Sequence, residues 1–104
     1  MKKQIEHVRK FHEVYEIPMT NGPGMPSKER QALRYRLLAE ELQEYKEACE
    51  NDDLVEVSDS LVDLAYILFG TVLEHGLDNH FEEMFEEVQR SNMSKLDRNG
   101  KPIK

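Results

Sequence analysis

The stretch DLVEVSDSLVDLAYILFGTVLEHG, residues 53–76, decides the fold. Asp53 is a good N-cap residue, and Gly76 is a natural residue to follow the end of a helix. Between them the spacing of apolar residues predicts a helix that continues to His75. The second half of this helix is apolar almost all round, which is typical of a buried helix. We therefore expect it to lie centrally, with one face left over for another subunit.

Helical spacing also dominates on both sides of this stretch, and no segment alternates like a half-buried strand. A first helix is predicted from Lys2 to Tyr15. The range Ile17–Pro26 is rich in proline and glycine and excludes a continuing helix. Ser27 can cap the second helix and Asp78 the fourth. The apolar stripes are Ile5, Val8, Phe11 and Tyr15 on the first helix, Leu33, Leu37, Leu38, Leu42, Tyr45 and Ala48 on the second, and Phe81, Met84, Phe85 and Val88 on the fourth. We predict an all-α fold: a four-helix bundle core in a single domain, 1–104, with a long loop between the first two helices and a polar C-terminal tail.

Composition limits the classes of partner. The 104 residues include 14 basic and 21 acidic side chains, a formal net charge of −7. A broad nucleic-acid interface needs a basic face, so we expect no nucleic-acid partner. The longest apolar run, residues 61–73, is interrupted by Asp63 and is too short to span a bilayer, so we expect no membrane partner. The single cysteine, Cys49, and the absence of an apolar leader fit a cytoplasmic protein.

Two clusters of acids do not look like ordinary surface acids. Glu40, Glu41 and Glu44 follow E-E-x-x-E spacing on the second helix. On the third helix, Glu56, Asp59 and Asp63 share one face, and Asp63 lies inside the apolar run. Burying unpaired carboxylates costs several kcal/mol, whereas two facing acidic helices can share hard cations such as Mg²⁺, with Mn²⁺ as a substitute. The alternatives are a solvated helix face and an ion pair of Asp63 with Arg34 or Arg36.

These residues resemble the all-alpha nucleoside triphosphate pyrophosphohydrolases, the superfamily of MazG-type enzymes and phosphoribosyl-ATP pyrophosphatase. That family carries E-E-x-x-E on one helix and E-x-x-D on the next, and binds Mg²⁺. The first half matches at Glu40, Glu41 and Glu44. The second half matches either as Glu56-Val57-Ser58-Asp59, or as an alignment on Asp63 in which Ser60 replaces the family's glutamate. Both alignments keep the acids on one helix face, and both remain open.

The resemblance extends over most of the chain, and its most distinctive run is Arg90-Ser91-Asn92-Met93-Ser94-Lys95. It implies hydrolysis of a nucleoside triphosphate or related nucleotide at the α-phosphorus, giving a monophosphate and pyrophosphate. It also implies a homodimer or dimer of dimers in which neighbouring subunits complete each site. The expected metal ligands are Glu41, Glu44, Asp59 and Asp63, followed by Glu56. The expected catalytic residues are Glu40 and Glu41. The expected substrate contacts are Asn92, Lys95, Arg90, Phe11 and His12.

Two questions stay open at this level. Phe11 and His12 are candidates to stack on or bond a nucleobase, but Phe11 also fits the apolar stripe of the first helix as a core residue. The alternative function is a non-catalytic helical module that binds a nucleotide or a protein partner through a degenerate metal site. The Ser60 departure is the feature that favours this alternative.

Overall fold

A computed structural model describes residues 1–96 and 98–101. The described residues form four helices: α1 (Lys2–Val14), α2 (Lys28–Glu50), α3 (Leu54–Glu74) and α4 (Phe81–Met93). The all-α fold is thereby confirmed, and the helix bounds lie close to those predicted. None of these helices is long and apolar enough to cross a membrane.

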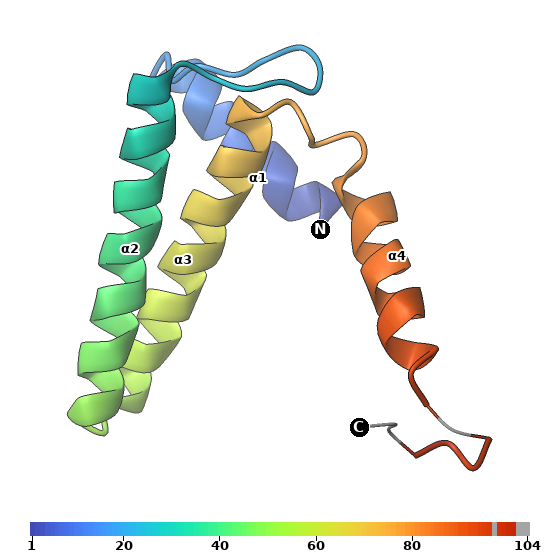
Figure 1. The fold of residues 1–104 in the computed structure, drawn as a ribbon. Coiled ribbons are helices and arrows are strands. Elements are labelled where there is room, and N and C mark those ends of the chain that lie inside the picture. Colours follow the sequence, from blue (N-terminus) through green and yellow to red (C-terminus); the bar gives the residue numbers. More distant parts are fainter. Residues whose placement is uncertain (97, 102–104) are drawn as a thin grey trace.

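The second and third helices form a long antiparallel hairpin (Figure 1). Asp53 caps α3 as predicted, since its Oδ1 accepts a hydrogen bond from the Glu56 amide at 3.1 Å. Ser27 caps α2 in the same way through the Arg30 amide. The connection is only three residues long, and Asp52 adopts a positive φ of 50° within it. This tight turn holds the two acidic helix segments side by side.

α1 packs against α3 near the open end of the hairpin, which confirms that α3 lies centrally between two neighbours (Figure 1). Ile5, Val8 and Leu73 form the buried apolar cluster there, and Met19, Phe69 and Phe81 pack around it. The chain leaves α3 through Gly76, whose φ of +65° suits glycine. The loop after α1 lies across this end of α3, where the Gly24 amide donates to the His75 carbonyl at 2.9 Å.

A buried ionic network joins α2 to the last turn of α3. The Glu74 side chain is 1% exposed and accepts hydrogen bonds from Arg30 at 2.8 and 2.9 Å. Arg34 lies 3.1 Å from the same carboxylate and donates to the Thr71 hydroxyl and the Ile67 carbonyl. Arg34 is committed to Glu74, and within the described residues no ion pair joins Asp63 to Arg34 or to Arg36, so that alternative was wrong.

α4 extends away from the hairpin (Figure 1). Its start is attached to the rest of the fold by an edge-to-face contact of Phe81 with Phe69, 6.5 Å between ring centroids. The predicted cap by Asp78 was wrong: Asp78 pairs with Arg9 on α1, and His80 precedes the helix without a side-chain cap. No residue of α4 is buried, and its stripe of Met84, Phe85 and Val88 is exposed.

Candidate metal centre

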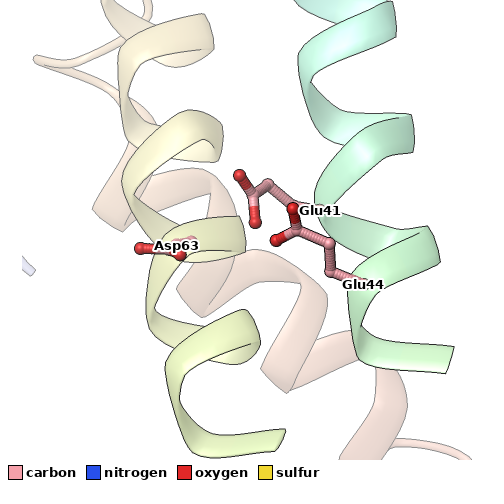
Figure 2. A group of neighbouring side chains, drawn as sticks. All are labelled: Glu41, Glu44 and Asp63. Atoms are coloured by element: carbon pink, nitrogen blue, oxygen red, sulfur yellow. The ribbon is translucent and has the colours of Figure 1, made fainter. Parts of the chain in front are cut away.

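Three carboxylates meet halfway along the hairpin. Glu41 and Glu44 extend from α2 toward α3, which carries Asp63 (Figure 2). One oxygen of each residue lies within 4.8 Å of one oxygen of each of the others. Glu41 and Glu44 are one turn apart on α2, so both can face the same point of the neighbouring helix. We call Glu41, Glu44 and Asp63 the acidic triad.

The triad is not neutralised by any cation within the described ranges. Every ion pair found among the described residues involves an acid outside the triad. The Oε2 atom of Glu41 is buried without a hydrogen-bond partner. Burial, with the charges of Glu44, Asp63 and Asp59, raises the pKa of Glu41 to about 7. Burial and the charge of Asp59 also raise the pKa of Asp63. Crowded carboxylates with an unused buried oxygen suit a hard divalent cation, which prefers oxygen ligands.

A cleft of about 540 Å³ leads from the triad toward the hairpin turn. Its lining is dominated by acids: Glu41, Glu44, Glu47, Asp53, Glu56, Asp59 and Asp63. The predicted ligands Asp59 and Glu56 therefore line the same cleft, although neither belongs to the triad. Ser60 also lines it, but its hydroxyl donates to the Glu56 carbonyl at 2.7 Å and is turned to its own helix.

The other predicted site residues lie apart from the triad. Glu40 is exposed on α2 and does not line the cleft. Arg90 and Asn92 are on α4, and Lys95 follows it. In the described residues, α4 is not among the helices that pack on the hairpin, Arg90 pairs with Glu87, and Lys95 reaches Asn92 at 3.4 Å.

Phe11 and His12 have opposite surroundings. His12 is 2% exposed, and its Nδ1 lies 3.4 Å from the Pro18 carbonyl oxygen. Burial is the main cause that lowers the pKa of His12, and the charge of Arg34 lowers it further. Gly70 makes room for these side chains: a Cβ there would lie 2.5 Å from Arg34 and 2.9 Å from His12. Phe11 instead remains 38% exposed.

Sequence reasoning missed the acids that extend the cleft toward the turn, Glu47 and Asp53. The signal was available for Glu47, which follows Glu44 by three residues and so shares its helix face. Asp53 was identified only as a cap, and it serves that role while also lining the cleft. The missed acids show that negative charge continues from the triad to the end of the hairpin.

Facing acidic segments on two antiparallel helices, in an all-α fold, agree with the all-alpha nucleoside triphosphate pyrophosphohydrolase superfamily, of which the matching family is a member. Within that superfamily the chain belongs to the phosphoribosyl-ATP pyrophosphohydrolase family, whose model matches residues 8–92. The family consists of metal-dependent pyrophosphohydrolases that act on nucleotide-like substrates. A search of curated proteins found no match to the chain.

The raised pKa of Glu41 predicts a distinctive pH dependence of stability in the metal-free protein. Its folded-state pKa of about 7 exceeds the ordinary 4.5, so between these values the folded state holds a proton that the unfolded chain has lost. The contribution of Glu41 to stability therefore falls as pH rises from about 5 to 7. We expect Glu41→Gln to gain thermal stability relative to wild type over this range, measured as Tm in EDTA.

A matched control is Glu82→Gln, which removes an exposed carboxylate on α4. The difference in Tm between this control and wild type should not change between pH 5 and pH 7.5. Parallel Tm curves for wild type and Glu41→Gln would show that Glu41 ionises normally.

Proposed function

We propose that this protein hydrolyses a nucleoside triphosphate, or a related nucleotide, at the α-phosphorus in an Mg²⁺-dependent reaction. The products are the nucleoside monophosphate and pyrophosphate. The observation that carries the proposal is the acidic triad, because its ligand atoms lie within 4.8 Å of one another without a cation from the described residues. Membership of the phosphoribosyl-ATP pyrophosphohydrolase family supports the reaction class.

In this proposal Glu41, Glu44 and Asp63 hold the metal, and Asp59 and Glu56 are placed in the same cleft to add ligands. When bound, Mg²⁺ supplies positive charge for the polyphosphate oxygens and lowers the pKa of water. Without it the cleft would repel a polyphosphate. Mn²⁺ prefers similar oxygen ligands and should substitute.

The proposed chemistry is an attack of water on the α-phosphorus, with pyrophosphate as the leaving group. An ionised carboxylate beside that water can accept a proton from it, and Glu41 is the first candidate for this role. Glu40, exposed beside it on α2, is the second candidate to position the water. Positive charge near the leaving group is then needed from elsewhere, because no lysine or arginine is among the described residues that line the cleft.

We assign that positive charge to Lys95 and Arg90 of a second copy of the chain. In one copy these residues lie on or after α4, which is not among the helices that pack on the hairpin. The stripe of Met84, Phe85 and Val88 on α4 is exposed in a single copy, so it is free to pack against a second copy. A homodimer that exchanges α4 would cover this stripe and bring Lys95 and Asn92 to the partner's triad.

Lys95→Ala is expected to raise the KM for nucleotide about tenfold or more, because it removes a charge-assisted hydrogen bond to phosphate. Steady-state kinetics at constant ionic strength provide the measurement. Lys28→Ala at the start of α2 is the control, since it removes the same charge from an exposed site away from α4. An equal effect of both substitutions would mean that Lys95 acts only through net charge.

Subunit mixing tests the exchange itself. Glu41→Gln and Lys95→Glu, each nearly inactive alone, should recover about a quarter of wild-type activity when refolded together at equal ratio, because half the dimers then contain one intact site. No recovery would place the acidic triad and Lys95 in the same subunit.

The experiment that tests the proposed function is pyrophosphate release from a panel of standard and modified nucleoside triphosphates and phosphoribosyl-ATP. It is run with Mg²⁺, with Mn²⁺ and with EDTA. We expect turnover of at least one member with either metal and none in EDTA. Binding of unaltered nucleotide without turnover of any member would instead favour the non-catalytic binding module.

A further inference from the structure

Three aromatic rings cluster on the surface where α1 crosses α3. The Phe11 ring lies 4.6 Å from the Tyr15 ring and 5.6 Å from the Tyr66 ring, measured between centroids. The contact with Tyr66 is edge-to-face, and the contact with Tyr15 is tilted by 41°. We call Phe11, Tyr15 and Tyr66 the aromatic cluster. Its members come from two helices, so the fold, and not one helix stripe, brings them together.

The aromatic cluster is partly exposed to water. Phe11 is 38%, Tyr15 66% and Tyr66 37% exposed, whereas the adjoining His12 is 2% exposed. The interior of the α1–α3 contact is therefore filled by other residues, and the rings lie at its edge. Covering water-exposed ring edges and faces with a flat apolar group is favourable, because it removes apolar surface from water.

The cluster adjoins the acidic triad. Tyr66 follows Asp63 by three residues on α3, which places it about 4.5 Å further along the helix axis and roughly 60° around it. The acidic cleft runs from the triad in the opposite direction, toward the hairpin turn. A ligand with one highly charged end and one flat aromatic end therefore matches the order of groups along α3.

We propose that the aromatic cluster receives the base of the nucleotide whose phosphates lie at the acidic triad. The inference rests on the proposed function and adds the base subsite to it. Stacking on exposed aromatic side chains is sequence-tolerant, because every base presents a flat face. The subsite thus supplies affinity for a nucleobase as a class, and Tyr66 lies at the border between base and phosphates.

The test compares a ligand with a base to one without. 2-Aminopurine riboside triphosphate reports stacking by loss of its fluorescence, and inorganic tripolyphosphate competes with it through phosphates alone. Both are titrated with Mn²⁺ and Mg²⁺ into wild type, Tyr66→Leu and Tyr15→Ser. Tyr35→Leu is the matched control, because Tyr35 is 73% exposed on α2 outside the aromatic cluster.

We expect Tyr66→Leu and Tyr15→Ser each to weaken binding of the 2-aminopurine nucleotide about tenfold and to restore its fluorescence, with tripolyphosphate affinity unchanged. Tyr35→Leu should behave as wild type. Tyr15 follows the last residue of α1, so we expect Tyr15→Ser to leave the helices intact. If circular dichroism shows that Tyr66→Leu has unfolded, the affinity of Tyr15→Ser for the 2-aminopurine nucleotide tests the inference.

Three results would overturn the inference. The first is unchanged nucleotide affinity in both variants. The second is an equal loss of tripolyphosphate affinity, which would assign the rings to the phosphate site. The third is a change of oligomeric state in sedimentation with base-dependent affinity intact, which would show that a second copy covers the rings. Failure of wild type to bind either ligand would instead refute the proposed function, and the inference with it.

Discussion

Replacing Glu41 with glutamine is expected to reduce kcat/KM for nucleotide hydrolysis at least about a hundredfold, because even the outer partners of metal ligands contribute tenfold to a hundredfold. The substitution keeps the shape of the side chain and removes its charge. It also removes the one carboxylate oxygen of the described residues that is buried without a partner. Asp63→Asn on the facing helix should have an effect of the same size, since both residues belong to the acidic triad.

The measurement is pyrophosphate release at saturating Mg²⁺, with far-UV circular dichroism to show that helix content is unchanged. Removing crowded negative charge should leave the metal-free variants as stable as wild type or more so, which separates lost chemistry from lost folding. Glu86→Gln, on the exposed face of α4, is the control for a change in net charge. Wild-type rates in Glu41→Gln and Asp63→Asn would refute the metal centre.

Glu74→Gln is expected to lower the free energy of unfolding by about 3 to 5 kcal/mol, because it leaves a buried arginine without its counter-ion. The Arg34 side chain is 6% exposed and Glu74 1%, so water cannot replace the lost charge. Such a loss is a large share of the stability of an ordinary domain. Urea denaturation followed by circular dichroism gives the value directly.

The control for this prediction is Glu50→Gln, which breaks the surface pair with Lys46, where both side chains are more than 60% exposed. Such pairs contribute from zero to about 1 kcal/mol. The double variant Arg34→Met with Glu74→Leu should recover much of the stability lost in Glu74→Gln, because it removes both buried charges together. Equal losses from Glu74→Gln and Glu50→Gln would show that the network is effectively solvated.

Local signals predicted α2 and α3 well, because the start of each and the end of α3 are marked by a residue whose chemistry acts within a few positions. Ser27 and Asp53 accept hydrogen bonds from the first turns they precede, and Gly76 supplies the positive φ after α3. The same logic failed for Asp78. Its carboxylate is drawn to Arg9 on α1, a partner that is distant in sequence.

The candidate site also contains residues that could be predicted from local sequence and residues that could not. Glu41, Glu44 and Asp63 could be expected together because helix periodicity fixes which residues share a face, and a short turn makes neighbours antiparallel. The contrast between buried His12 and exposed Phe11 could not, since it depends on how α1 crosses α3. Tyr66 was likewise hidden within an apolar run. Its neighbours in the aromatic cluster become visible only when the two helices cross.

The three-residue turn between α2 and α3 sets how the carboxylates of the acidic triad on the two helices are aligned. A longer connection would allow α3 other offsets and rotations against α2, and Asp63 would no longer be held at the face that carries Glu41. The positive φ of Asp52 lets the chain reverse in so few residues. The length of this connection is thus as much a requirement of the candidate metal centre as the carboxylates are, and we expect relatives with a longer or shorter turn to lose activity.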